Sequence, residues 1–127
     1  MKIEHIAFVV QDPAAMAAWY AEHLGFTIKR ALDVSPFIHF LADDAGTMLE
    51  IYRQPHIRTP DYREADPLVL HIAFVSEDVQ ADRARLMSAG AVPVGEISET
   101  EAGDQLAMLR DPWGFAIQLA KRSVPMT

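Results

Sequence analysis

A chain of 127 residues with a net charge of −7 and half of its residues apolar has the size and balance of one soluble domain with a buried core. The acidic charge argues against a nucleic-acid-binding surface, which needs clustered basic side chains. Cysteine is absent, which excludes disulfides, thiol catalysis and thiolate metal ligands. The sequence shows neither a signal core nor an apolar run of membrane-spanning length, which predicts a cytoplasmic protein without a membrane partner.

A five-residue word occurs twice in the sequence. His-Ile-Ala-Phe-Val stands at His5–Val9 and again, 66 positions later, at His71–Val75. In each half an Asp lies seven residues after the histidine, and later a Gly precedes a long polar residue by four positions: Asp12 and Asp78, Gly46 with Glu50, and Gly114 with Gln118. Two copies of one plan predict a pseudo-symmetric domain or dimer rather than a solenoid.

The first half is predicted to form a strand, a helix and three strands. Alternating β-branched and aromatic residues predict a strand buried on both faces at Lys2–Val10. Asp12 and Pro13 suit the N-cap and first turn of a helix over Ala14–Leu24. The remaining strands are predicted at Phe26–Val34, Phe37–Ala42 and Thr47–Arg53.

The second half repeats this order after a polar segment with three prolines, which is typical of a linker. Strands are predicted at Leu68–Ser76, Val92–Ile97, Asp104–Arg110 and Phe115–Lys121, with a helix from Asp78 to about Ala89. We therefore expect a single domain over residues 1–127, with module one at about 1–54, the linker at about 55–67 and module two at about 68–121.

Each repeated strand places one polar side chain on a face whose other residues are often small. Strand alternation gives this position to four residues: His5, Glu50, His71 and Gln118. A lone strand histidine is more often a hydrogen-bonded residue than a ligand, and a lone glutamate is usually solvated. Buried polar groups are costly unless they are paired or coordinated, however, and imidazole and carboxylate suit a divalent metal such as Zn, Ni, Fe, Co or Mn. The pattern alone leaves both interpretations open.

The order of elements and these four positions resemble the vicinal oxygen chelate superfamily, which groups glyoxalase I, extradiol dioxygenases, bleomycin resistance proteins and methylmalonyl-CoA epimerase. Further words support the resemblance over about residues 2–120: Trp19-Tyr20, Leu24-Gly25-Phe26, and Arg110 to Gly114. The resemblance implies an α+β fold of two βαβββ modules, whose mixed sheets curl into a half-barrel cleft around a divalent metal. It also implies that a homodimer is common.

Gln118 departs from this family, in which the eighth strand usually carries a glutamate. An amide can coordinate a metal through its oxygen but cannot accept a proton near neutral pH. The same departure counts against an extradiol dioxygenase, which takes its carboxylate from that strand. Glu50, at the pseudo-symmetric position, could take over the acid–base role.

Other candidates are weaker. His39 could face the same cavity, although hydrogen bonding within its strand is the commoner role. Tyr52 and Arg53, followed by His56 and Arg58, could hold an anionic substrate or simply form a solvated loop. Trp113 could flank the mouth of the pocket, although packing is its commoner role.

The resemblance implies a metal-dependent, glyoxalase-like lyase, isomerase or epimerase for a small substrate with two neighbouring oxygens. The divalent metal would be held by His5, Glu50, His71 and Gln118, with Glu50 as the catalytic proton acceptor. The alternative is a metal-free protein of the bleomycin-resistance type that sequesters a ligand. The metal and the substrate are not predicted by any motif.

Overall fold

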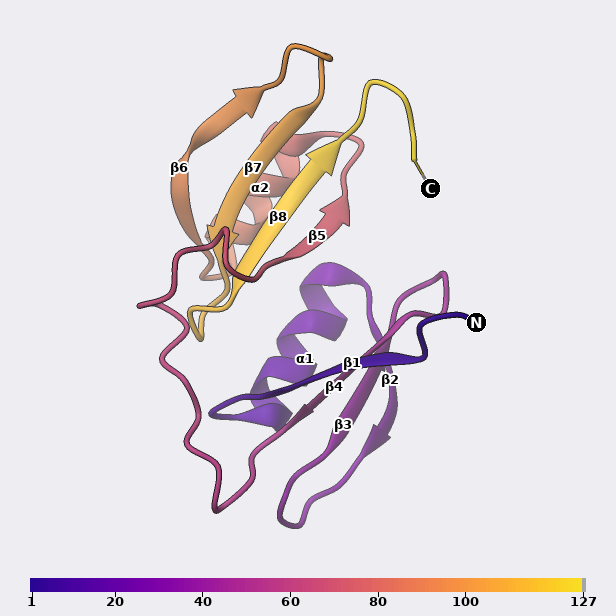
Figure 1. The fold of residues 1–127 in the computed structure, drawn as a ribbon, viewed down its shortest axis with the longest axis vertical. Helices are drawn as coiled ribbons and strands as arrows, with labels where there is room; N and C mark the ends of the chain where they lie inside the picture. The colour runs from indigo at the N-terminus through magenta and orange to yellow at the C-terminus, as the bar shows by residue number, and fades with distance from the viewer. Residues whose placement is uncertain (127) are drawn as a thin grey trace. The chain divides into compact units, whose positions relative to one another are not determined.

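The computed structural model describes residues 1–126, and the chain divides into two compact units, Met1–Pro60 and the residues from Asp61 onward (Figure 1). The boundary falls within the segment predicted to link the two modules. Each unit contains one helix and one four-stranded mixed sheet. The predicted α+β class with two βαβββ modules is therefore confirmed.

The first unit follows the predicted order of elements. Its elements are β1 (His5–Val9), α1 (Pro13–Leu24), β2 (Thr27–Ala31), β3 (His39–Ala42) and β4 (Met48–Tyr52). The sheet order is β1-β4-β3-β2, in which β1 runs parallel to β4 and the other neighbours are antiparallel.

The second unit repeats this topology. Its elements are β5 (Ile72–Val75), α2 (Val79–Ser88), β6 (Val92–Glu99), β7 (Gln105–Arg110) and β8 (Ala116–Lys121). The sheet order is β5-β8-β7-β6, again with one parallel pair, β5 and β8. The repeated sequence word thus forms the edge strand of each sheet.

Both helices begin with the same N-cap. The Asp12 carboxylate accepts a hydrogen bond from the Ala15 N–H at 3.0 Å, and the Asp78 carboxylate accepts one from the Ala81 N–H at 3.0 Å. Such caps satisfy N–H groups that have no partner within the helix. The core of each unit lies between the helix and one face of its sheet and is made of fully buried side chains: Met16, Tyr20, Leu41 and Ile51 in the first, and Val79, Leu86, Leu109 and Ile117 in the second.

The prediction that the first strand is buried on both faces is wrong. Residues His5 to Ala7 are exposed, and the Ile6 side chain is 48% exposed although it lies on the helix side of the sheet. β1 is the edge strand, and α1 packs mainly on β2, β3 and β4. Alternation of apolar residues identified the strand but could not show its place in the sheet.

The predicted strand from Leu68 begins later than expected, at Ile72. Residues 67–69 form a turn instead, because Asp66 accepts two backbone hydrogen bonds. Its carboxylate accepts one from the Leu68 N–H at 2.8 Å, and its carbonyl accepts one from the Val69 N–H at 2.9 Å. This Asx turn competes successfully with the strand ladder. His71 therefore lies just before β5 rather than within it.

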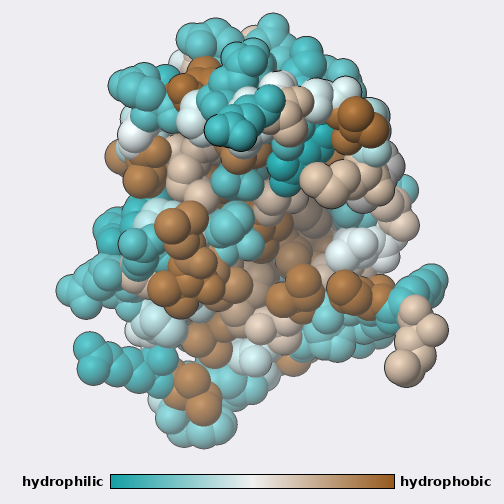
Figure 2. Space-filling model, turned by 45° about the horizontal axis from the view of Figure 1, so that its top comes forward, coloured by the Kyte–Doolittle hydropathy of each residue, from teal (hydrophilic) through white to brown (hydrophobic). Residues whose placement is uncertain are grey.

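The surface carries apolar side chains in patches among hydrophilic ones (Figure 2). Several belong to β5 or to the turn before it: Leu68, Val69, Leu70 and Val75. Neither of the helices within residues 1–126 is long and apolar enough to span a membrane.

Candidate functional site

A histidine and a carboxylate meet on the open face of the first sheet. β1 and β4 pair with His5 opposite Met48 and Ala7 opposite Glu50, so His5 and Glu50 are diagonal neighbours on one face. The His5 Nε2 atom lies 3.3 Å from a Glu50 carboxylate oxygen. The Glu50 side chain is only 17% exposed, whereas that of His5 is 37% exposed. Strand alternation predicted the shared face, and the parallel register brings the two groups into contact.

Glu4 completes this cluster, and sequence reasoning missed it. Its carboxylate accepts a hydrogen bond from His5 Nδ1, which leaves Nε2 directed at Glu50. The hydrogen bond to Glu4 raises the pKa of His5. Desolvation opposes this increase in the pKa, and the negative charges of Glu4 and Glu50 add smaller contributions that raise it. The two carboxylates therefore favour a cation at this position, which is either the protonated ring or a metal.

The same face carries an aromatic and basic wall. The Phe40 backbone lies opposite that of Glu50, and the Phe40 ring meets the His5 ring edge to face at 5.6 Å between centroids. The Arg30 guanidinium lies 5.7 Å from the centre of the Phe40 ring. Phe40 and Arg30 line a hollow of about 160 Å³ together with Glu4, Lys29 and Met48. Sequence reasoning missed Phe40 and Arg30, because their place on this face depends on the register in which β4, β3 and β2 pair.

His71 is held by the segment that precedes it. Its Nδ1 atom lies 2.8 Å from the Pro67 carbonyl oxygen, which can only accept a hydrogen bond. The proton of the neutral ring is therefore on Nδ1, and Nε2 keeps its lone pair. Both repeated histidines thus have Nδ1 bonded within the chain and Nε2 available, as metal-binding histidines generally do.

Gln118 occupies the position in the second unit that Glu50 holds in the first. Ala73 lies opposite Gln118, as Ala7 lies opposite Glu50, so the two ladders have the same register. Gln118 therefore lies on the same face of the second sheet as Ala73, and His71 lies just before the paired residues of β5. An amide replaces the carboxylate here, and this half of the candidate site has no negative charge.

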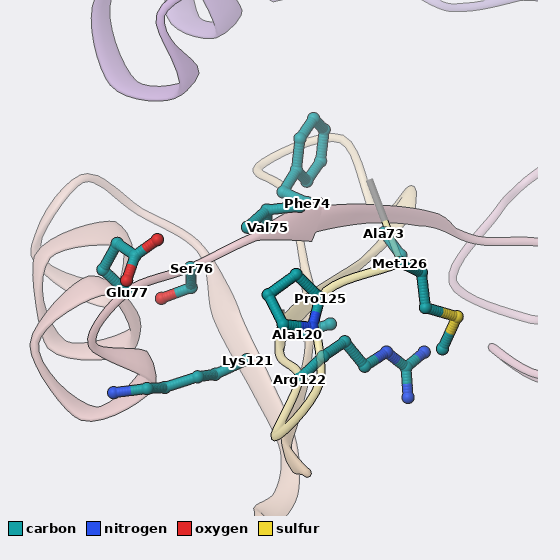
Figure 3. Close-up of a pocket in the computed structure, with 10 residues that line it drawn as sticks. All are labelled: Ala73, Phe74, Val75, Ser76, Glu77, Ala120, Lys121, Arg122, Pro125 and Met126. Atoms are coloured by element: carbon teal, nitrogen blue, oxygen red, sulfur yellow. The ribbon is translucent and has the colours of Figure 1, made fainter.

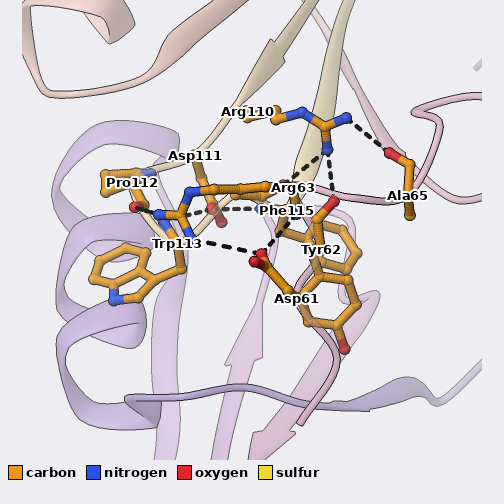
Figure 4. A network of polar contacts seen from close by, with 10 residues as sticks. Asp61, Tyr62, Arg63, Ala65, Arg110, Asp111, Pro112, Trp113 and Phe115 are labelled. Atoms are coloured by element: carbon orange, nitrogen blue, oxygen red, sulfur yellow. Dashed lines mark hydrogen bonds and ion pairs between the residues drawn. The ribbon is translucent and has the colours of Figure 1, made fainter.

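A hydrogen-bonded network fixes the segment before His71 (Figure 4). One Arg110 amino group donates to the Tyr62 carbonyl at 2.7 Å and to the Gly114 carbonyl at 3.1 Å, and the other donates to the Ala65 carbonyl at 2.7 Å. Arg63 donates in return to the Pro112 carbonyl at 2.8 Å. The strong donor capacity of a guanidinium thus ties residues 62–65 to the β7–β8 turn. Because Pro67 follows directly, we infer that Arg110 positions His71.

The Asp111–Gly114 word of the sequence forms this turn. The Asp111 side chain, which is buried, accepts hydrogen bonds from the Trp113 and Phe115 N–H groups, each at 2.9 Å. Trp113 is half-buried beside the Arg63 side chain in Figure 4. Trp113 belongs to the network that holds the linker, and a substrate contact by Trp113 stays a prediction.

Tyr52 and Arg53 end the strand that carries Glu50. Tyr52 lies opposite Val9 on the same face as Glu50 and is half-buried. The Arg53 guanidinium donates to the Gln11 carbonyl at 3.4 Å, and its backbone N–H donates to the Pro36 carbonyl at 2.8 Å. The structure therefore brings Tyr52 to the face of Glu50 and ties Arg53 to the loops beside it.

His39 lies on the other side of the sheet. Its backbone is opposite Ile51, which packs in the core beneath α1, and its side chain is buried. The His39 Nδ1 atom donates to the Phe37 carbonyl at 2.8 Å. The structure thus gives His39 the role of a hydrogen-bonded core residue and separates it from the face that carries His5 and Glu50.

The donor atoms fit a divalent metal in part. Two ligand atoms, each bound about 2.1 Å from one metal, lie roughly 3.0–3.4 Å apart in tetrahedral or octahedral geometry, and the His5–Glu50 separation of 3.3 Å falls in this range. Within residues 1–126, no group of three or more His, Asp or Glu side chains is arranged so that it could hold a metal ion, and the Glu4–His5–Glu50 cluster is not an exception. Each unit therefore offers a pair of donors rather than a complete ligand set.

The topology is that of a glyoxalase-type fold. The sequence profile of the Glyoxalase/Bleomycin resistance protein/Dioxygenase superfamily matches residues 2–119, which is nearly the whole chain. The chain belongs to this superfamily, as the sequence resemblance predicted. No curated protein matches it.

Solved structures agree on the fold. A glyoxalase family protein from Bacillus cereus is 21% identical with a TM-score of 0.81, over 96% of this chain and 94% of that one. An antibiotic binding protein, TnmS3, from Streptomyces sp. CB03234 is 25% identical with a TM-score of 0.73, over 97% of both chains. A glyoxalase I mutant from Zea mays is 22% identical with a TM-score of 0.75, over 97% of this chain but 46% of that one.

Proposed function

We propose that this protein is a divalent-metal-dependent lyase, isomerase or epimerase of the glyoxalase type that acts on a small substrate with two neighbouring oxygens. The observation that carries the proposal is the His5–Glu50 pair, whose donor atoms lie 3.3 Å apart. The ligand set would be His5 and Glu50 from one module with His71 and Gln118 from another. When bound, the ion would supply Lewis acidity toward the substrate oxygens.

Each of these four residues has a distinct role in the proposal. The Nδ1 hydrogen bonds of His5 and His71 hold both rings with Nε2 available. Glu50 is the proton acceptor, because Gln118 has no basic site. Phe40 and Met48 line the neighbouring hollow, and Phe40 lies opposite Glu50 across the β3–β4 pair.

Turnover by matched variants tests the role of Glu50. The protein, loaded with Zn, Ni, Co or Mn in turn, is assayed on thiol adducts of keto-aldehydes. Glu50→Gln is expected to lower kcat by at least about 100-fold, the usual contribution of a general base, while leaving the fold intact. Gln118→Glu is the matched control, since it adds a carboxylate at the equivalent position, and is expected to retain or increase kcat. Full activity of Glu50→Gln would contradict the assignment.

A second candidate function is sequestration of a ligand without turnover. Gln118 favours it, because one half of the site lacks a proton acceptor, and the similarity to an antibiotic binding protein points the same way. Glu4 and the fixed histidine tautomers favour the metal site instead. Tight binding of a small molecule to metal-free protein, with no turnover by any metal-loaded form, would support sequestration.

We further expect a homodimer or a close association of modules, because β1 and β5 are edge strands with exposed residues. An unpaired strand edge favours contact with another element. Light scattering on the eluting protein gives its mass directly.

A further inference from the structure

Besides Glu50 and Gln118, the open faces of the two sheets differ at the position opposite the repeated valine. Val9 lies opposite Tyr52 in the first unit, and Val75 lies opposite Ala120 in the second. The edge strands are identical in sequence over these residues, so the difference comes from β4 and β8 alone. A phenol ring occupies the position in the first unit where the second has only a methyl group.

A pocket of about 410 Å³ lies beside Ala120 in the second unit (Figure 3). Its apolar lining comes from the ends of β5 and β8 and from the segment that follows β8: Ala73, Phe74, Val75, Ala120, Pro125 and Met126. The volume falls in the range of small-molecule sites, roughly 300–1,000 Å³. An aromatic ring and a thioether in one lining favour an aromatic ligand.

The charged residues at the rim balance one another. Arg122 is paired with Asp104, with 2.8 Å between the guanidinium and the carboxylate. Lys121 and Glu77, which have opposite charges, both line the pocket and lie on the same side of it in Figure 3. The charges of these four side chains sum to zero, so the rim does not select strongly for a cationic or an anionic ligand.

We propose that this pocket of the second module binds an uncharged small molecule with an aromatic body. Contact with Val75, Ala120 and Met126 supplies the affinity, because burial of apolar area is the favourable term that this lining offers. The side chains of Lys121 and Glu77 give the rim groups that can hydrogen-bond a hydroxyl or carbonyl of the ligand. The site lies wholly within the second unit and needs no metal. The inference rests on the second candidate function, ligand binding without turnover, and a test on metal-free protein separates it from the metal-dependent function.

Titration of isotope-labelled, metal-free protein with naphthylmethanol, followed by amide NMR in the presence of a chelator, tests this site. We expect saturable shifts at the Ala73, Val75 and Ala120 amides. Naphthoate and naphthylmethylammonium, which share the ring but carry opposite charges, are expected to bind no more tightly than the alcohol. Shifts confined to other parts of the chain, or a charged analogue that binds over about tenfold tighter, equivalent to about 1.4 kcal/mol, would overturn the proposal.

Two pairs of variants localise the binding. Val75 is 74% exposed, so Val75→Trp fills the pocket without repacking the core and is expected to weaken binding at least about tenfold. Val92→Trp, at a 58% exposed site on β6 outside the lining, is the control and is expected to bind normally. Met126→Asp is likewise expected to weaken binding, whereas Val124→Asp in the same tail is not. Equal binding by all four variants would overturn the site.

Discussion

In the first module, β1 and β4 bring a histidine and a carboxylate within 3.3 Å of each other, whereas the equivalent strands of the second module carry a histidine and an amide. The backbone register is the same in both. The first module therefore concentrates negative charge from Glu4 and Glu50 around one imidazole. In the second module, the backbone carbonyl of Pro67 holds the imidazole in place. The second module also has a pocket with a largely apolar lining at the ends of β5 and β8.

This difference separates the residues that build the fold of each module from the residues that determine the chemical character of its open face. The residues that repeat, such as the capping Asp12 and Asp78, recreate the same helix and sheet twice. The residues that do not repeat determine the charge of the open faces and the volume left free beside them. Replacing residues that the modules share should therefore have equal effects, and replacing residues that they do not share should have unequal ones.

The largest effect is expected at Arg110, which has no counterpart in the first module. Arg110→Met removes three hydrogen bonds from a charged donor and should lower the free energy of unfolding by about 3 kcal/mol. Urea denaturation measures this change. Arg53→Met, which removes a single bond of 3.4 Å, is the control and should cost less than about 1 kcal/mol. Equal losses would refute a special role for the Arg110 network.

The glycines of the two β turns give the sharpest matched pair. Gly46 and Gly114 have nearly the same φ, 87° and 91°, so alanine at either adds backbone strain of about 1 kcal/mol or more. A side chain at Gly46 meets open space, whereas one at Gly114 would overlap Arg63 Cγ and lie 3.2 Å from the Arg63 backbone nitrogen. Gly114→Ala should therefore cost about 1–2 kcal/mol more than Gly46→Ala. Thermal unfolding of the two variants measures both losses of stability. Equal losses would contradict the close packing of the linker against the turn at Gly114.

The helix caps should respond alike. Asp12→Ala and Asp78→Ala each remove one side-chain hydrogen bond of 3.0 Å to a helix N–H, and each should cost about 1 kcal/mol. Chemical denaturation of both variants provides the comparison. A difference beyond about 1 kcal/mol would mean that one module depends on its helix more than the repeat implies.

The smallest effect concerns acid stability and belongs to the second module. A hydrogen bond from the Ser76 hydroxyl lowers the pKa of Asp82 below its ordinary 3.8, with burial opposing and Arg85 assisting. A carboxyl with a lowered pKa contributes stability that is fully present above its unfolded-state pKa and is lost as the pH falls toward its folded-state pKa. Ser76→Ala should therefore be less stable near neutral pH, with the difference shrinking in acid. Denaturation curves at about pH 7 and about pH 3 test the sign, and a constant difference would contradict it.

The sequence predicted the fold well because its signals were local or repeated. Alternation, the Asp caps and the duplicated motif identified the ten elements within residues 1–126, and the family resemblance supplied the topology of two βαβββ modules. His5, Glu50 and Gln118 lie within strands, as predicted, whereas His71 lies just before its strand. The start of β5 was missed because Asp66 captures the amides of Leu68 and Val69, a side-chain effect that periodicity does not record. Burial of β1 was overestimated, because its position at the sheet edge depends on pairing with β4.

The candidate site was only partly predictable. His5 and Glu50 share a face by alternation. Strand parity assigns Glu4 to the opposite face, but its carboxylate nevertheless joins the site through a hydrogen bond with the neighbouring residue, His5. Phe40 joins the face through its pairing with β4, and Arg30 joins it through its pairing with β3. No local pattern in the sequence contains this register. The tautomer of His71 depends on Pro67 and hence on a linker held by Arg110, 39 residues further along the chain.

Metal stoichiometry of the purified, untagged protein tests the central claim most directly. Plasma mass spectrometry after reconstitution with a divalent ion and gel filtration should give about one metal per chain, since the proposed ligand set holds a single ion. The His5→Ala/His71→Ala double variant should retain almost none, while a His23→Ala/His56→Ala control should bind normally. No metal in the unaltered protein, or unchanged metal in the His5→Ala/His71→Ala variant, would contradict a site built on the repeated histidines.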